Sequence, residues 1–185
     1  MGASRIILVT GLPGTGKTTL ARTLASRYRL PLIAKDLVKE PLFDVLGAAD
    51  AAESRRLSDA SFAVLFAIAR ELHAAGADML LEGNFRSGEH EQVLSAAIPV
   101  WNGQARVAQV LCRVDEGERV ARLARRRTDP ARHAGHRDGD LALATPAARS
   151  DAFLDLPGAR FVYSGVDERE VVAALDAWWN SSARQ

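Results

Sequence analysis

The sequence predicts an α/β fold in which a parallel sheet is covered by helices on both faces. Two observations support this prediction. Apolar runs of strand length alternate with segments of helical periodicity along the 185 residues, which is the pattern of successive strand–helix–strand units. The first apolar run, residues 6–9, is followed directly by a glycine-rich turn and a helix-like segment. No repeat or low-complexity linker divides the chain, so we expect a single domain over residues 1–185.

The glycine-rich turn is GLPGTGKTT at residues 11–19, which matches the phosphate-binding P-loop pattern G-x-x-x-x-G-K-[ST]. Its glycines let the backbone turn tightly and point N–H groups inward, where a side chain would block a phosphate. The start of the next helix adds its positive dipole end. Lys17 is placed for the β- and γ-phosphates, and Thr18 for Mg²⁺. The residues expected to bind nucleotide are Gly11, Pro13, Gly14, Thr15, Gly16, Lys17, Thr18 and Thr19.

The other elements follow from periodicity and from the residues that bound them. Residues 20–28 are expected to form a helix, and Pro31 precedes a short strand at 32–34. Apolar residues at helical spacing predict a long helix over 54–75, closed by Gly76. Further strands are expected at residues 5–10, 78–82, 105–114 and 160–163, and further helices at 88–97, 116–127 and 168–179. Trp178 and Trp179 are interpreted as packing residues of the last helix.

Composition narrows the classes of function. The net charge is +1, so bulk electrostatics favours neither nucleic acid nor a membrane as partner. The chain has a single cysteine, Cys112, and one cysteine excludes an internal disulfide framework. Cys112 lies in an apolar run and is interpreted as a core residue. No apolar run approaches the length of a membrane span and no signal-peptide pattern is seen, so we expect a cytoplasmic protein. The sequence gives no indication of oligomeric state.

Lys35 and Asp36 follow the second expected strand. In an open α/β sheet, ligands bind at the carboxyl ends of the strands. A carboxylate at this place can accept the proton of an attacking hydroxyl or help to hold Mg²⁺. The alternative is that Asp36 caps a helix beginning at Leu37. Lys35 is expected to contact substrate or phosphate, unless it is an exposed loop lysine.

Glu82 follows the third expected strand, where an acidic residue positions Mg²⁺ and its waters. That position usually holds Asp, so the longer Glu82 is expected to reach the metal through water or to bind substrate instead. Asn84 adds an amide, Phe85 an aromatic face and Arg86 a positive charge. The predicted substrate contacts in this segment are Glu82, Asn84, Phe85 and Arg86.

An arginine-rich stretch follows the fourth expected strand and is predicted to form a lid over residues 119–145. Arg122 and Arg126 lie four residues apart and therefore on one helix face. Such a basic flap can close over ATP and neutralise the transferring phosphoryl group. A solvated charged helix and a site for RNA phosphates are the alternatives. Arg132 is a further predicted substrate contact. His133 and His136 lack a third ligand cluster, so no zinc site is expected.

The turn after the fifth expected strand contains Ser164 and Gly165. Gly165 is a predicted nucleotide contact through backbone groups near the adenine. The turn could equally be a plain helix start capped by Ser164 or Asp167.

Through these segments the chain resembles small P-loop kinases related to adenylate, gluconate and shikimate kinases. It looks closest to bacterial proteins described as AAA family ATPases, which are grouped with zeta toxins and chloramphenicol phosphotransferase. The resemblance runs through GLPGTGKTT, the Lys35-Asp36 pair, LEGNF at residues 81–85 and the lid. It implies the three-layer P-loop NTPase fold, with a five-stranded parallel sheet in the order 2-3-1-4-5.

The resemblance also implies chemistry: transfer of the γ-phosphate of ATP, with Mg²⁺, to a hydroxyl group. The base of such kinases corresponds to Asp36. Their lid arginines correspond best to Arg122 and Arg126, and then to Arg119, Arg132 and Arg137. The expected metal residues are Thr18, Asp36 and Glu82. Glu82 departs from the Asp of simpler kinases, which leaves its role open between metal and substrate.

The sequence therefore predicts an ATP-dependent kinase acting on a small molecule such as a metabolite, a sugar nucleotide or an antibiotic. Lys17, Asp36, Arg122 and Arg126 are the expected catalytic residues. A regulatory NTPase that binds nucleotide without phosphorylating a substrate is one alternative. A polynucleotide kinase is another, although the near-neutral charge argues against a dedicated nucleic-acid binder.

Overall fold

The computed structural model describes residues 3–130, 132–135 and 151–181. A five-stranded sheet forms its centre, and all of the strand pairs are parallel. The elements are β1 (Ser4–Gly11), α1 (Lys17–Tyr28), β2 (Leu32–Ala34), α2 (Lys35–Leu46), α3 (Ala51–Ala74), β3 (Met79–Glu82), α4 (Glu91–Ala97), the 3₁₀ helix η1 (Val100–Asn102), β4 (Ala105–Cys112), α5 (Glu116–Arg127), β5 (Ala159–Tyr163) and α8 (Glu168–Ser181). The strand order is β2-β3-β1-β4-β5, which confirms the predicted order.

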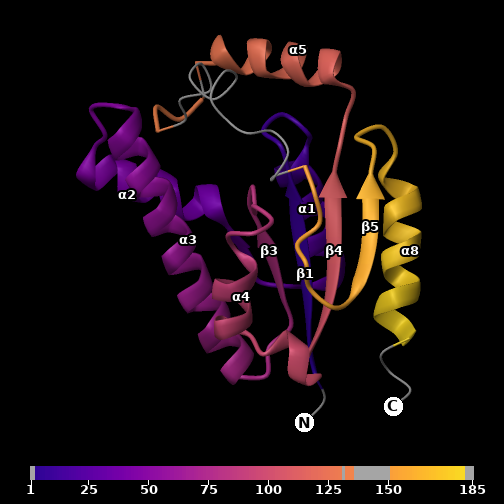
Figure 1. The fold of residues 1–185 in the computed structure, drawn as a ribbon. Helices are drawn as coiled ribbons and strands as arrows, with labels where there is room; N and C mark the ends of the chain where they lie inside the picture. Colours follow the sequence, from indigo (N-terminus) through magenta and orange to yellow (C-terminus); the bar gives the residue numbers. More distant parts are fainter. Residues whose placement is uncertain (1–2, 131, 136–150, 182–185) are drawn as a thin grey trace.

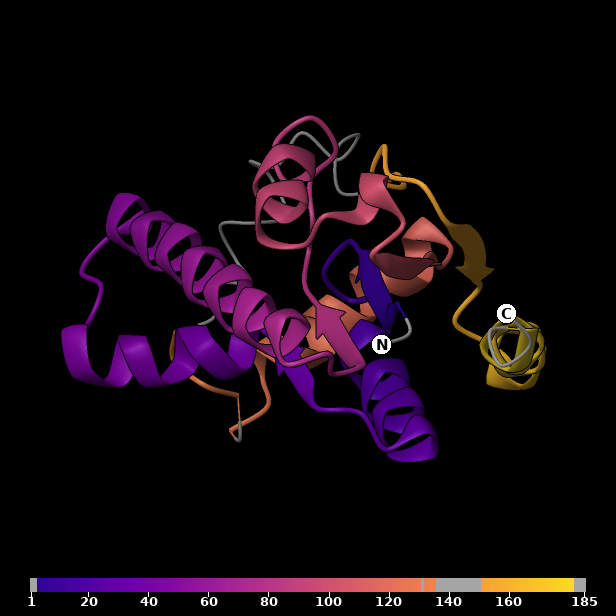
Figure 2. The ribbon, with the colours of Figure 1, turned by 90° about the horizontal axis from the view of Figure 1, so that it is seen from below.

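Helices cover both faces of the sheet (Figure 1). Side chains alternate along β1, so Ile6 and Leu8 join a core with α3 and α4, whereas Ile7 and Val9 join a core with α1 and α8. Because β1 lies between β3 and β4 with a helical layer on each side, its sequence is a continuous apolar run. The view along the strands shows these layers, with α2 and α3 projecting together on one side of the sheet (Figure 2).

Helix α2 is the element that the sequence offered only as an alternative. It begins directly after β2, with Ala34 as its N-cap residue, and includes Pro41 in its interior. Asp36 therefore lies in the first turn of the helix, and the alternative that it caps a helix starting at Leu37 is wrong. A proline in mid-helix is a helix-breaking signal, which explains why the sequence gives only weak support for this helix.

Several boundaries differ from the predicted ones, each for a local reason. Helix α3 starts three residues earlier than expected because the side chain of Asp50 accepts a hydrogen bond from the Glu53 amide. Its C-terminal end agrees with the prediction, since Gly76 takes φ +72° and follows the last turn. Strand β4 ends at Cys112, and Asp115 caps α5. The helix expected from residue 88 begins only at Glu91.

The predicted packing residues lie in the core or against it. Cys112 is fully buried, and burial raises the pKa of its thiol to about 12. Trp179 stacks on Tyr28 with ring centroids 4.6 Å apart, and the guanidinium of Arg5 lies over the same indole. In the described part of the chain, no helix combines the length and the hydropathy that crossing a bilayer requires.

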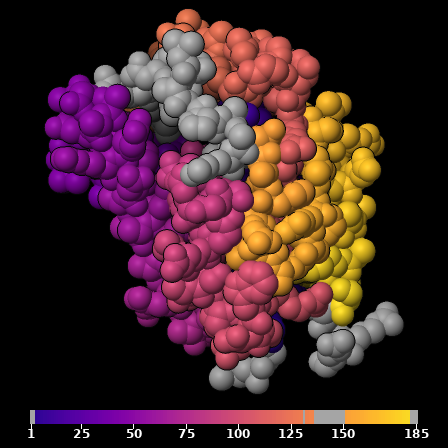
Figure 3. Space-filling view, viewed as in Figure 1, coloured from indigo at the N-terminus to yellow at the C-terminus, as the bar shows by residue number. Residues whose placement is uncertain are grey.

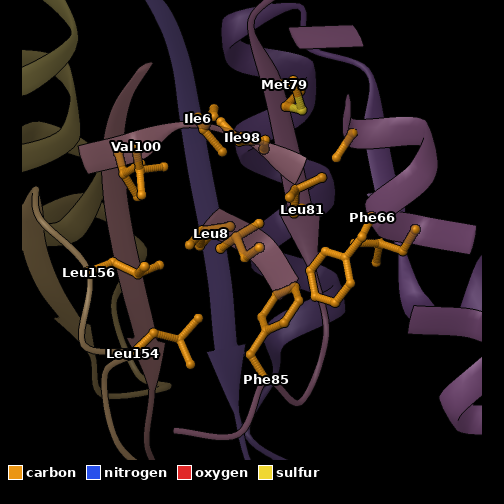
Figure 4. Packing of buried hydrophobic residues seen from close by; sticks show 14 of the residues in the cluster. Ile6, Leu8, Phe66, Met79, Leu81, Phe85, Ile98, Val100, Leu154 and Leu156 are labelled. Atoms are coloured by element: carbon orange, nitrogen blue, oxygen red, sulfur yellow. The ribbon is translucent and has the colours of Figure 1, made fainter. Parts of the chain in front are cut away.

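Phe85 requires a correction, because the sequence placed its ring among the substrate contacts. The structure buries it completely in the core beside Leu8, Leu81 and Phe66 (Figure 4). Its ring centroid lies 5.5 Å from that of Phe62. A ring without exposed surface packs against its neighbours and cannot face a ligand in this conformation.

His90 completes this aromatic cluster as a neutral histidine. Its ring centroid lies 4.2 Å from that of Phe62, and its Nδ1 accepts a hydrogen bond from the backbone N–H of Arg86 at 2.8 Å. Burial, assisted by the positive charge of Arg86, lowers its pKa from 6.5 to about 4. The proton of the neutral ring is assigned to Nε2, since Nδ1 acts as the acceptor.

Replacing Phe85 by alanine is expected to lower the free energy of unfolding by about 3–5 kcal/mol, because it leaves a cavity in a fully buried cluster. Urea denaturation measures the change. Val166→Ala is the control, since Val166 is 89% exposed and its truncation should change stability by less than about 0.5 kcal/mol. An equally small effect of both substitutions would contradict the core position of Phe85.

We expect the pH dependence of the free energy of unfolding to reflect the titration of His90. Its folded-state pKa is depressed, so the unfolded chain takes up the proton first as the pH falls, and stability is lost between about pH 6.5 and 4. The loss attributable to this group is about 2–3 kcal/mol between pH 7 and 4. His90→Asn keeps an acceptor for the Arg86 amide but does not titrate. Denaturation at several pH values should therefore show a flatter profile for this variant, and identical profiles would refute the assignment.

Candidate functional site

The P-loop connects the end of β1 to α1 and is closely packed at Gly11 and Gly14. Gly11 takes φ +138°, and a Cβ there would lie 2.3 Å from the carbonyl oxygen of Cys112. At Gly14, with φ +90°, a Cβ would meet Arg119 and Leu123 of α5 within 3.3 Å. The loop is therefore confined between β4 on one side and α5 on the other.

Lys17 folds back into the loop that precedes it. Its Nζ donates to the carbonyl oxygen of Leu12 at 2.8 Å, and the hydroxyl of Thr15 donates to the same oxygen at 2.8 Å. The side chain of Lys17 is largely buried, and this burial lowers its pKa, while the carboxylate of Glu82 acts in the opposite direction. The ammonium group thus lies inside the phosphate-binding loop, next to a negative charge.

Thr18, Asp36 and Glu82, the predicted metal ligands, are brought together from α1, α2 and β3. The Thr18 hydroxyl donates to Glu82 Oε2 at 3.4 Å. Burial raises the pKa of Glu82, and the charge of Asp36 raises it further, whereas Lys17 lowers it. Two carboxylates and a hydroxyl are oxygen ligands that suit Mg²⁺, which keeps several waters and takes further oxygens from phosphates. The residues present therefore fit that ion.

Among the residues that the structure describes, no group of three or more His, Cys, Asp or Glu side chains could hold a metal ion. His133 pairs with Asp44, with 3.0 Å between Nε2 and Oδ1. His136, the other histidine considered for zinc, lies outside the described residues.

Asp36 occupies the first turn of α2 beside the P-loop. Its Oδ1 lies 3.2 Å from Lys35 Nζ, and its side chain remains 38% exposed. The charge of Asp36 acts on both Lys17 and Glu82. Gly83 lies against Lys35, since a Cβ on the glycine would be 3.4 Å from the Cβ of the lysine. The ends of β2 and β3 therefore form one side of the site.

Helix α5 crosses the carboxyl end of the sheet above the P-loop (Figure 1). Arg119 is ion-paired with Glu116 at 2.7 Å and reaches toward the carbonyl oxygen of Pro13 at 3.5 Å. The space-filling view shows that α5 covers the end of the molecule at the top of the picture (Figure 3). The predicted lid helix is therefore packed directly on the phosphate-binding loop.

Arg122 and Arg126, the two arginines singled out in the sequence, both lie on the side of α5 that faces the site. Arg122 donates from Nε to Glu118 at 2.7 Å and from Nη2 to the carbonyl oxygen of Gly165 at 3.4 Å. Its Nη1 would be 3.6 Å from a Cβ on Gly16. The positive charge of Arg126 lowers the pKa of Lys17. Both guanidinium groups therefore contribute positive potential at the P-loop.

The turn after β5 closes the other side of the P-loop. A Cβ on Gly165 would lie 2.2 Å from Val114, and the residue takes φ +81°. Tyr163, at the end of β5, has its Cε1 3.8 Å from the position of a Cβ on Gly16. Sequence reasoning missed Tyr163, although its place at the end of a strand was a usable signal. Arg122, Tyr163 and Gly165 thus converge beside the first turn of α1.

The remaining predicted substrate contacts are positioned differently. Asn84 is partly buried at the end of β3. Arg86 is held by two carboxylates, with Nη2 3.7 Å from Asp59 Oδ1 and Nε 2.6 Å from Glu89 Oε2. Arg132 is partly buried, and Arg137 lies outside the described residues, as does the predicted lid segment 136–145.

Contacts between the segment that follows α5 and helix α2 are the feature that the sequence did not indicate. His133 binds Asp44, and its ring meets Phe43 edge-on with centroids 5.7 Å apart. Gly135 lies against the same phenylalanine, since a Cβ there would be 3.0 Å from Phe43 Cγ. The chain beyond α5 thus bridges the site to the end of α2 that is distant from Asp36.

Comparison with known proteins shows which family the chain belongs to. The sequence profile of the AAA domain family matches residues 6–142, which is well over half of the chain. None of the curated proteins matches the sequence significantly. Among solved structures, a protein of Chloroflexus aurantiacus described as a candidate kinase is similar, with 29% identity and a TM-score of 0.82, covering 96% of this chain and 98% of its own.

Two more distant structures share the fold. The APS kinase CysC of Mycobacterium tuberculosis, solved with AMPPNP and APS, has 17% identity and a TM-score of 0.56, covering 95% of this chain and 99% of its own. Kti12 of Chaetomium thermophilum, solved with ADP-AlF3, has 20% identity and a TM-score of 0.58, covering 95% and 97%. The resemblance to P-loop kinases is confirmed, and the chain belongs to the AAA domain family, with the fold of the P-loop kinases.

Proposed function

We propose that the protein is an ATP-dependent kinase that transfers the γ-phosphate to a hydroxyl group of a small molecule. The observation that carries this proposal is the convergence of Lys17, Asp36 and Glu82 beside the P-loop, from three separate elements. Lys17 is positioned for phosphate, Glu82 and Thr18 for the metal, and Asp36 for an incoming hydroxyl. The candidate kinase of Chloroflexus aurantiacus, similar over nearly the whole of both chains, supports the same reaction class.

The P-loop amides and the ammonium group of Lys17 would bind the β- and γ-phosphates. Lys17 exchanges its hydrogen bond with the Leu12 carbonyl for bonds to phosphate oxygens. Thr18 and Glu82 would hold Mg²⁺, which supplies positive charge to the phosphate oxygens. Arg122 and Arg126 add positive potential from α5, where charge accumulates on the transferring group.

Asp36 would act as the base. The acceptor oxygen forms a bond to the γ-phosphorus, the bond between that phosphorus and the bridging oxygen breaks, and ADP leaves. The hydroxyl proton passes to the Asp36 carboxylate, whose partial exposure leaves it accessible to an incoming alcohol. The carboxylate lies 3.2 Å from Lys35 Nζ, which helps to hold it beside the P-loop.

Incubation of the protein with ATP, Mg²⁺ and pooled metabolites and antibiotics tests the reaction class. Mass spectrometry should detect an acceptor that gains one phosphate group only when enzyme and ATP are both present. Hydrolysis of ATP with no phosphorylated acceptor in any pool would favour the regulatory NTPase. Phosphorylation of oligonucleotide ends, with binding that falls steeply as salt is added, would favour a polynucleotide kinase.

Asp36→Asn is expected to lower the rate of phosphate transfer by at least about 100-fold, because it removes the proton acceptor while keeping the shape of the side chain. The affinity for ATP should stay within about threefold of wild type, since the P-loop is untouched. Coupled ADP release and calorimetric titration measure the two quantities. Asp155→Asn is the control, because that side chain is 92% exposed and distant in sequence from the P-loop. Full transfer activity in Asp36→Asn would remove Asp36 from the mechanism.

Arg122→Ala should weaken ATP binding by about tenfold, because it removes a charge-assisted donor beside the P-loop and Gly165. Arg125→Ala is the matched control on the same helix, since it loses the same charge from a side chain that is 71% exposed. Titration with ATP and Mg²⁺ at fixed ionic strength compares the two variants. Equal losses would mean that the effect is one of net charge and not of position.

A further inference from the structure

Helix α3 carries a stripe of apolar residues on the face that it exposes, in addition to the apolar residues that it buries. Ala60, Ala63, Val64, Ala67 and Ile68 are all exposed. They follow the spacing i, i+3, i+4, i+7 and i+8, which places them along one side of the helix. The opposite side carries the buried core residues. An exposed helical face normally carries charged or polar residues, so this face has the pattern of a covered surface.

Helix α2 extends this surface. Its side chains Leu37, Pro41 and Val45 line an apolar groove of about 430 Å³ together with Val64 of α3. Val45 is 82% exposed and Leu37 is 53% exposed. We call the combined surface of α2 and α3 the α2–α3 apolar face. Figure 2 shows that these two helices project from the side of the sheet, where another molecule could reach them.

Charges at the two ends of the exposed stripe on α3 indicate what covers it. Arg56 precedes the stripe and Glu71 follows it, and both are exposed. Glu71 contacts only its neighbour Arg70 among the described residues, at 3.0 Å and in solvent, which is a weak interaction. Arg56 and Glu71 are fifteen positions apart, which is slightly more than four helical turns, so both lie on the side of the stripe.

This arrangement is self-complementary about a two-fold axis. If α3 packs antiparallel to a second α3 with the axis between Ala63 and Val64, Arg56 lies opposite the partner's Glu71, and Ala60 lies opposite the partner's Ala67. Each contact then occurs twice, as an isologous interface requires. Alanine at the closest positions allows two helices to approach to the short interaxial distances of well-packed pairs.

We propose that the α2–α3 apolar face binds a second copy of the chain, in a two-fold symmetric dimer with antiparallel α3 helices. The proposal is independent of the kinase reaction. Leu37, Pro41 and Val45 recur every four residues on α2, whereas Asp36 faces Lys35 and the P-loop. The interface therefore leaves the phosphate-binding side of α2 uncovered.

Sedimentation of the full chain over roughly 1–100 µM measures the dimer dissociation constant. Val64→Glu places two carboxylates beside the two-fold axis and should raise that constant at least tenfold. Arg56→Glu and Glu71→Arg should each raise it about tenfold, because each turns two attractive pairs into repulsive ones. Arg56→Glu combined with Glu71→Arg restores opposite charges across the interface and should return the constant toward the wild-type value. Arg22→Glu on α1, with the same change of charge, should have no effect.

The charge-reversal variants alter exposed side chains only, so they remain informative if Val64→Glu fails to fold, as circular dichroism would reveal. A wild-type chain that stays monomeric over the whole range would overturn the proposal. A dimer that responds to Arg22→Glu as strongly as to Arg56→Glu would do the same. A dimer for which the double variant is no better than either single variant would refute the antiparallel pairing.

Discussion

The close approach of the P-loop backbone to β4 and α5 is the constraint on which the rest of the site depends. Gly11 leaves no space between itself and the carbonyl of Cys112, and Gly14 leaves little between itself and Arg119. These contacts fix the loop from two directions while its N–H groups remain available to an anion. They also explain why arginines of α5 reach the site. A helix that packs on the loop itself places its side chains beside the loop without a long movement of the chain.

The charges beside that loop stabilise one another. A buried ammonium group and a buried carboxylate each lose hydration, and each would be costly alone. Lys17 and Glu82 offset this cost by their attraction, as the opposite directions of their mutual effects on pKa indicate. Asp36 adds a second negative charge and raises the pKa of Glu82. A pair of neighbouring carboxylates of this kind is the oxygen-rich surrounding that suits a divalent cation, because a cation relieves their repulsion.

The sequence predicted the elements whose signals are local. The P-loop, the alternation of strands and helices and the long helix α3 follow from short patterns of glycine and apolar residues. Helix α2 does not, since Pro41 interrupts the helical signal and its apolar residues lie on an exposed groove and not toward the core. Phe85 was wrongly predicted to contact substrate because its neighbours in the sequence are polar. Its burial depends on Phe62 and Phe66 of helix α3. The contact between His133 and Asp44 joins residues 89 positions apart, so no local sequence pattern predicts it.

Helix α2 has three surfaces with three different surroundings, which makes it the element that connects the site to the rest of the molecule. Its first turn carries Lys35 and Asp36, its last turns contact His133 and Gly135, and its outer side is the apolar groove. Pro41 lies between the first turn and the lid contact and removes one backbone hydrogen bond there. The helix is therefore least firmly held by its own backbone at its middle. The first turn of α2 holds Asp36 beside Lys35, and the contact with His133 holds the opposite end of the helix, so packing at both ends supplements the backbone where Pro41 weakens it.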